Sequence, residues 1–209
     1  ACLVVSEAEE AELERVIAEH FRELEELTKG LAVLGELTPR SWDAIASYGE
    51  RLSSRIVELA FRRFDLDSVH VDARQLIITD RRHTQAAPLS VETRARLSAV
   101  IPRLAENKVV VMGGFIAATE DGVTTTLGRG GSDYTAALIG AGINAEEIQI
   151  WTDVDGMLTA DPNIVPEAHR VKIISFDEAA ELAYFGAKVL HPSTVLPAIE
   201  RNIPVLILN

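Results

Sequence analysis

The sequence has little cysteine and no long apolar run, and each shortage excludes a class of protein. Its one cysteine, Cys2, cannot form a disulfide within the chain, which argues against a disulfide-stabilised secreted domain and favours a reducing compartment. No stretch approaches the roughly 20 apolar residues of a membrane-spanning helix, and the first residues lack the pattern of a signal peptide. We therefore expect a soluble protein with no membrane partner, in the cytosol or, in a plant, in a plastid.

Basic residues are also few, with 20 Lys and Arg against 32 Asp and Glu and a formal net charge of -12. Proteins that bind the phosphates of nucleic acids generally present a basic face, so we expect no nucleic-acid partner. An anionic substrate would need a local cluster of arginine, lysine and helix N-termini inside this repulsive field. Few residues can supply one.

No linker, internal repeat or low-complexity tract divides the 209 residues, 47% of which are hydrophobic. Short β-type runs alternate with helical patterns, which predicts an α/β fold, a three-layer α/β/α sandwich with a largely parallel central sheet. Helices are expected over residues 7–26, 39–64, 90–105, 132–141, 177–185 and 193–200. Strands are expected over residues 69–71, 76–79, 108–112, 148–151 and 205–208.

Two junctions near the N-terminus stand out. Thr38 is the expected N-cap of a helix that opens at Pro39. The predicted apolar face of that helix consists of Ile45, Leu52, Ile56, Leu59 and Ala60. By contrast, the change from Leu3–Val5 to a helical pattern at Ser6 contains no turn residue, so we expect residues to be missing after Ser6.

Residues 124–133 form the segment most suited to binding an anion. Gly130 and Gly131 allow close approach of a ligand to the backbone, and the helical turn that begins at Ser132 offers free N–H groups. Arg129 can bind a carboxylate through two parallel hydrogen bonds. The alternative is a solvated loop in which Ser132 is an ordinary N-cap.

Asp133 and Lys188 are candidate partners. Asp133 lies in a first helical turn, where a carboxylate often does no more than complement the helix dipole. Beside an anion site, it would instead have to orient a cation. Lys188, in a segment with Gly186 and Pro192, is the candidate cation and could contact phosphate as a point charge.

Other candidates lie where strands end. Thr152 and Asp153 follow the strand that ends at Trp151, the usual position of ligand-binding groups in an open α/β sheet, and could contact a ribose or a base. Asp161 closes the loop beyond them. Glu50 lies within a helix, where a surface ion pair is the ordinary explanation.

Taken together, residues 47–54, 113–116, 124–133, 151–162 and 185–192 resemble the motif series of aspartate kinases. Residues 124–138 and 185–192 distinguish that family from the acetylglutamate, carbamate and uridylate kinases that share its fold. The resemblance implies an ATP-dependent enzyme that phosphorylates the side-chain carboxylate of L-aspartate. Mg²⁺ would be held through the nucleotide phosphates rather than by protein ligands.

The resemblance also implies a role for each matched residue. Glu50 would bind the ammonium group of aspartate and Arg129 its α-carboxylate. Asp133 would orient the catalytic lysines, and Lys188 would contact the phosphates. The rest of the aspartate pocket would consist of Ser6, Phe115, Ser132 and Asp133. The nucleotide site would consist of Thr152, Asp153, Leu158, Asp161 and Asn163.

The chain departs from the family pattern in three places. The family's Lys-Phe-Gly-Gly motif and the loop that follows the position of Ser6 are absent. Leu158 and Asn163 replace a tyrosine and an arginine in the nucleotide loop. We expect an aspartate-binding part over about residues 1–140 and a nucleotide-binding part over about 141–209, without the family's regulatory ACT domains, in a parent that is a homodimer. A non-catalytic binding module remains the alternative.

Overall fold

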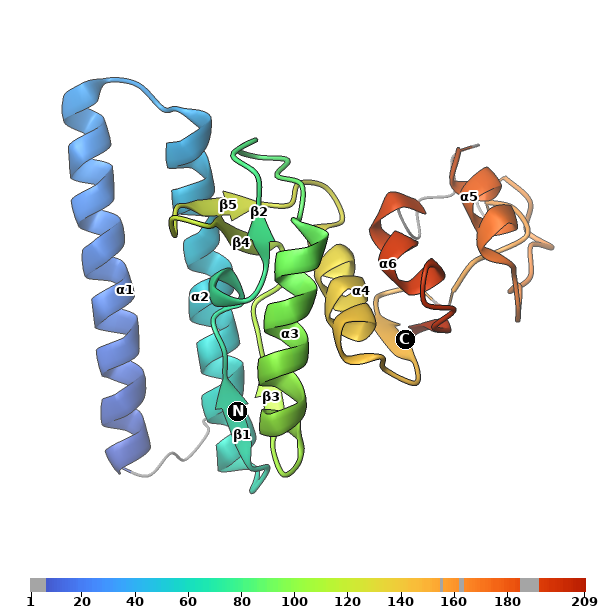
Figure 1. Ribbon diagram of the computed structural model, residues 1–209, viewed down its shortest axis with the longest axis horizontal. Helices are drawn as coiled ribbons and strands as arrows, with labels where there is room; N and C mark the ends of the chain where they lie inside the picture. The colour runs from blue at the N-terminus through green and yellow to red at the C-terminus, as the bar shows by residue number, and fades with distance from the viewer. Residues whose placement is uncertain (1–6, 155, 162–163, 185–191) are drawn as a thin grey trace. The chain divides into compact units, whose positions relative to one another are not determined.

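The computed structural model describes residues 7–154, 156–161, 164–184 and 192–209 (Figure 1). The chain divides into two compact units, Ala1–Gly128 and Arg129–Asn209. The functional boundary expected near residue 140 stays a prediction, because compactness alone does not say what each part binds. None of the described helices combines the length and the apolar character needed to cross a membrane.

Helix α1 (Glu7–Leu34) is longer than predicted, because it continues through Gly30. It stops where Gly35 adopts a left-handed φ of 70° and donates its N–H to the Leu31 carbonyl, a common helix ending. Val16 is the one residue of α1 among those described that is buried. Ion pairs with α2 hold the helix instead, between Arg51 and Glu23 at 3.0 Å and between Arg55 and Glu12 at 2.6 Å.

Helix α2 (Pro39–Arg63) confirms the predicted bounds, and Thr38 caps it by accepting a hydrogen bond from the Ser41 N–H at 3.2 Å. Its predicted apolar face is largely wrong. Ile56 is 38% exposed, and of the five predicted residues only Leu59 is buried. The other buried residues are polar: Asp43, Ser47, Ser54 and Glu58. Spacings of four and seven residues place these polar residues on one face of α2, and that face is buried.

The strands of the first unit form two small sheets. In the first, β1 (Ser68–His70) pairs in parallel with β3 (Val109–Val111). In the second, β2 (Ile78–Thr79) pairs in parallel with β4 (Ile116–Thr119), which pairs antiparallel with β5 (Thr124–Thr126). A 3-10 helix (Ala73–Gln75) lies just before β2, and the strand expected over 76–79 is shorter than predicted. Residues 124–126, which lie outside the expected strands, form β5.

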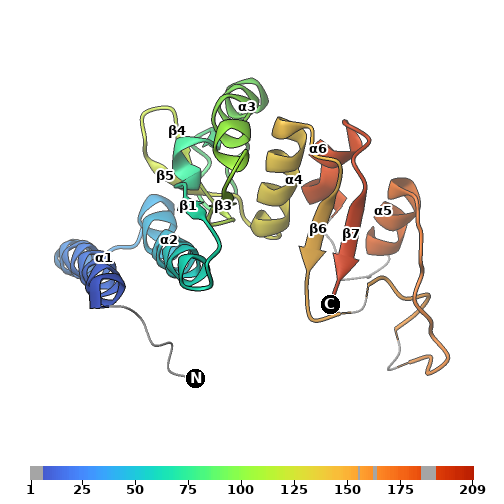
Figure 2. The same ribbon diagram turned by 90° about the horizontal axis from the view of Figure 1, so that it is seen from below.

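Helix α3 (Ser90–Ala105) has the predicted bounds. It lies on the opposite side of the strands from α2 (Figure 2). The side chains buried with the strands include Ile77, Ile78, Leu97, Ile101 and Ile116.

The second unit is built on two parallel strands, β6 (Ile148–Trp151) and β7 (Val205–Leu208). Helices α4 (Gly131–Ile143) and α6 (Leu196–Ile199) pack with them, and Ala137, Ile148, Ala198 and Ile203 form the core. Helix α5 (Phe176–Tyr184) and a 3-10 helix (Pro192–Val195) complete the unit. Three of the four pairings between described strands are parallel, which confirms the predicted α/β class.

Candidate active site

The backbone of Glu50, in α2, lies against Gly113, two residues after the end of β3. A Cβ atom added to Gly113 would lie 2.9 Å from the Glu50 carbonyl oxygen, too close for any other residue without a shift. The Ser54 hydroxyl donates to the same carbonyl at 2.7 Å. Glu50 itself is half-buried. Two segments that the sequence analysis selected separately, residues 47–54 and 113–116, therefore meet here.

Phe115 occupies a strained turn between β3 and β4. Its φ of 67° lies in the left-handed region, which costs a bulky residue about 1–3 kcal/mol and persists only where the surroundings enforce it. The Leu127 N–H donates to the Phe115 carbonyl at 2.9 Å. This bond joins residues 113–116 to residues 124–133, a third predicted motif.

Asp43 is a functional candidate that the sequence analysis missed. Its side chain is fully buried and lies 2.6 Å from the Thr126 hydroxyl, 3.0 Å from the Thr84 N–H and 2.7 Å from Nδ1 of His83. It thus joins α2 to the end of β5 and to the loop of residues 80–87. An aspartate followed four residues later by Ser47, in the helix that carries Glu50, was the available signal, but the helical pattern gave more weight to the apolar residues.

Gly128 lies two residues beyond the end of β5. Its φ is 77°, and a Cβ atom there would lie 3.0 Å from the Thr84 carbonyl oxygen. Only glycine meets both conditions without strain. Gly128 is the last residue of the first unit, and Arg129 follows it in the chain.

The beginning of α4 differs from the prediction by one residue. Gly130, at a φ of 69°, is the N-cap, with no hydrogen bond from a side chain, so the helix starts at Gly131 and Ser132 lies within its first turn. The alternative in which Ser132 is an ordinary N-cap is therefore wrong. Arg129 and Ser132 are exposed. The N–H groups of this turn face no side-chain cap, which suits an incoming anion.

Asp133, in the same turn, is half-buried, and burial raises the pKa of its carboxyl group above the ordinary value. No neighbouring charge among the described residues contributes to the shift. A carboxyl group that is partly removed from solvent, with no cation beside it to stabilise its charge, is typical of a functional site.

Thr152 and Asp153 lie at the carboxyl end of β6, as predicted. The Thr152 N–H extends the β6–β7 pairing by donating to the Leu208 carbonyl at 2.9 Å, and its hydroxyl donates to the Asp153 carboxylate at 3.2 Å. Asp153 is exposed. The end of β6 thus presents a hydroxyl and a carboxylate together.

The loop beyond β6 is held by its own backbone. The Val171 N–H donates to the Met157 carbonyl at 2.8 Å, and Leu158 bridges to Arg170. Asp161 accepts the Val165 N–H at 2.8 Å through its backbone carbonyl, and its side chain is exposed. An apolar hollow of about 1040 Å³ reaches Gly156 and Met157 and is bounded by β7, α5 and α6. Ser6, Asn163 and Lys188 lie outside the described residues.

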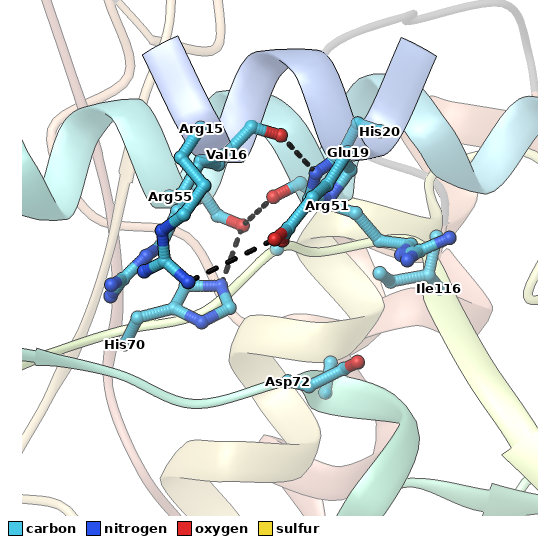
Figure 3. A pocket seen from close by; sticks show the side chains of 12 residues that line it. Arg15, Val16, Glu19, His20, Arg51, Arg55, His70, Asp72 and Ile116 are labelled. Atoms are coloured by element: carbon cyan, nitrogen blue, oxygen red, sulfur yellow. Dashed lines mark hydrogen bonds and ion pairs between the residues drawn. The ribbon is translucent and has the colours of Figure 1, made fainter. Parts of the chain in front are cut away.

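A second cavity, of about 330 Å³, lies within the first unit (Figure 3). Its charged and aromatic lining comes from α1, α2 and the end of β1, and consists of Arg15, Glu19, His20, Arg51, Arg55, His70 and Asp72. All three arginines, Arg15, Arg51 and Arg55, are paired with carboxylates of α1. None of the predicted site residues that the structure describes lines this cavity.

Comparison with known proteins shows which sequences and structures this chain resembles. Lysine-sensitive aspartokinase 3 of Escherichia coli is 43% identical over 192 residues, which cover 88% of this chain and 42% of that protein. Chloroplastic aspartokinase 3 of Arabidopsis thaliana is 46% identical over 201 residues, 93% of this chain and 35% of that protein. The chain thus spans less than half the length of these curated relatives.

Among solved structures, E. coli aspartokinase III in complex with aspartate and ADP matches with a TM-score of 0.85 and 39% identity, over 93% of this chain and 43% of that one. The model of the amino acid kinase family matches residues 4–209, almost the entire sequence. The chain therefore belongs to the amino acid kinase family.

Proposed function

We propose that the protein containing this chain is an aspartate kinase, which transfers the γ-phosphoryl group of ATP to the side-chain carboxylate of L-aspartate and forms 4-phospho-L-aspartate. The observation that carries the proposal is the meeting of three motifs in the first unit. Glu50 contacts Gly113, and Phe115 is hydrogen-bonded to Leu127. The relatives named above are aspartokinases, and one was crystallised with aspartate and ADP.

In this proposal, recognition of aspartate needs one anion and one bidentate cation. Glu50 binds the ammonium group, and Arg129 binds the α-carboxylate through two parallel hydrogen bonds. Phe115, whose turn is held in a strained conformation, contributes to the aspartate pocket. Ser6 and Ser132 complete it.

We assign the nucleotide to the second unit. Thr152 and Asp153 supply polar groups at the end of β6, followed by Leu158, Asp161 and Asn163 in the loop beyond. Lys188 contacts the phosphates. Mg²⁺ bound to the nucleotide would neutralise phosphate charge, and it keeps several waters in such sites, so no protein ligand is assigned to it.

The chemistry requires positioning more than covalent participation. The substrate carboxylate attacks the γ-phosphorus in line with the leaving oxygen, and the protein aligns the two and stabilises the charge. Asp133 orients Lys188 for that purpose. Burial raises the pKa of Asp133, and a lysine brought beside it would favour the charged form of the carboxyl group.

We further propose that the protein works as a homodimer in a reducing compartment, which would be the plastid in a plant. The plant relative named above is chloroplastic.

The test is a hydroxamate assay on the complete open reading frame that contains this chain. Hydroxylamine traps an acyl phosphate, so aspartate and MgATP should give a hydroxamate in step with ADP release. N-acetylglutamate serves as a rival acceptor in the same assay, and UMP, whose phosphorylated product forms no hydroxamate, is followed through ADP release alone. A hydroxamate formed from N-acetylglutamate and not from aspartate would reassign the substrate, and inactivity with all acceptors would favour a non-catalytic module.

A further inference from the structure

The Asp43 carboxylate is hydrogen-bonded to three residues that lie outside α2. Its Oδ1 lies 2.6 Å from the Thr126 hydroxyl and 3.0 Å from the Thr84 N–H, and its Oδ2 lies 3.0 Å from the same N–H and 2.7 Å from Nδ1 of His83. Both oxygens thus accept hydrogen bonds. An asparagine has a single acceptor oxygen, so it could keep the contact to His83 only by donating to Nδ1, and it would carry no charge.

These contacts converge on the strand end that precedes Arg129. The Thr126 carbonyl accepts the Ala86 N–H at 2.9 Å, so the loop that Asp43 holds is also paired with β5. Two residues later, Gly128 packs against the Thr84 carbonyl oxygen. The position of Gly128 therefore depends on Thr84, and Thr84 is fixed by Asp43.

Asp43 and Glu50 lie on the same face of α2. They are seven residues apart, which corresponds to about 10 Å along the helix axis and almost two full turns. One rigid helix thus carries Glu50 and also the carboxylate that fixes the backbone leading into Arg129.

We propose that Asp43 is a positioning residue for aspartate binding. Through Thr126 and Thr84, it sets the backbone at Gly128 and hence the point from which Arg129 extends. This inference rests on the proposed function, because it assigns Asp43 to the aspartate side of the site and not to the nucleotide side. Its loss should raise the KM for aspartate while the KM for ATP changes little.

The experiment compares two buried carboxylates of α2 in the complete protein. Asp43→Asn should raise the KM for aspartate about ten-fold, as expected when a charged hydrogen-bond network is lost. Glu58→Gln is the matched control. Glu58 is equally buried, but its carboxylate pairs with Arg55 and Arg62 within the same helix. The Glu58→Gln variant should have a lower melting temperature, and its KM for aspartate should stay within about two-fold of wild type.

A second pair of variants keeps the test decisive if Asp43→Asn fails to fold. Thr126→Val, nearly isosteric, removes the hydroxyl that faces Asp43 and should also raise the KM for aspartate, whereas Thr126→Ser should restore it. The inference is overturned if Thr126→Val leaves that KM unchanged, or if both substrates' KM values rise together. A wild type that makes no aspartyl phosphate refutes the proposed function first, and this inference with it. An active wild type with unaffected variants refutes this inference alone.

Discussion

The Glu50 carbonyl occupies the place that a side chain at position 113 would need, since a Cβ atom on Gly113 would lie 2.9 Å from it. Gly113→Ala should therefore push the end of β3 away from α2. We expect a stability loss of about 1–3 kcal/mol and a higher KM for aspartate, because the displaced turn packs against Glu50.

Gly49→Ala is the matched control for this change. A Cβ atom at Gly49 meets nothing within 4 Å, and replacing a glycine in a helix should stabilise by about 0.5–1 kcal/mol. Urea denaturation with steady-state kinetics compares the two variants. Equal effects at both positions would contradict the close contact.

Asp133→Asn should lower kcat about a hundred-fold, because misplaced lysines no longer stabilise the transferring phosphoryl group. It should also stabilise the protein at neutral pH. Burial raises the pKa of Asp133, so its charged form opposes folding above that pKa, and the penalty disappears as the pH falls below the unfolded value near 3.8. Thermal melts of wild type and Asp133→Asn from pH 3 to pH 8 test whether the stability difference between them disappears at low pH.

The control is Asp177→Asn, which changes an exposed carboxylate in the first turn of α5. It should cost about 0.3–1 kcal/mol through the helix dipole, with kcat unchanged. If Asp133→Asn behaves in the same way, Asp133 is a capping residue and nothing more.

His70 should make stability depend on pH. Burial, and secondarily Arg55, lowers its pKa below the ordinary 6.5, although Asp72 and Glu58 oppose the shift and His20 adds to it. The unfolded chain then binds this proton more readily than the folded chain, so stability falls as the pH drops through 6.5 and below.

His70→Gln should remove that loss while its amide keeps a partner for the Ser54 hydroxyl, which lies 3.0 Å from Nε2 of His70. The midpoints of denaturant unfolding at several pH values measure this loss of stability. The control is His169→Gln, which changes an exposed histidine. An unaltered pH dependence in His70→Gln would show that other groups cause it.

Arg129→Lys should weaken aspartate binding far more than a like-charge exchange implies, because lysine cannot form the paired planar contacts of a guanidinium. About 1.5–3 kcal/mol is at stake, or roughly ten- to a hundred-fold in KM. Arg103→Lys, an exposed change near the end of α3, is the control. An unchanged KM for aspartate would remove Arg129 from the pocket.

Local signals explain what the sequence analysis predicted correctly. Thr38 and Pro39 define the start of α2 because a capping hydroxyl and a fixed φ act within one turn. Ile148–Trp151 and Val205–Leu208 are compact β-type runs that pair as parallel strands. The motif at residues 124–133 was selected from its glycines and hydroxyls, although its first three residues proved to be a strand.

What the sequence analysis missed depends on partners far along the chain. The inward face of α2 was predicted to be apolar, because an argument from helical periodicity assigns the buried positions to apolar side chains. Asp43 is buried because Thr126, Thr84 and His83 supply hydrogen-bond donors from 40 to 83 residues away, which no local window contains. Lys188, Ser6 and Asn163 stay predictions, since they lie outside the described residues.

The buried polar face of α2 also affects how the first unit unfolds locally. An apolar helix face can slide or loosen gradually, but a buried carboxylate that loses its donors while still in a dry interior is costly. The first turns of α2 and the end of β5 should therefore lose their native contacts in one step, although 83 residues separate Asp43 from Thr126. Amide hydrogen exchange would report the two segments as a single cooperative unit, with matching protection and matching sensitivity to denaturant.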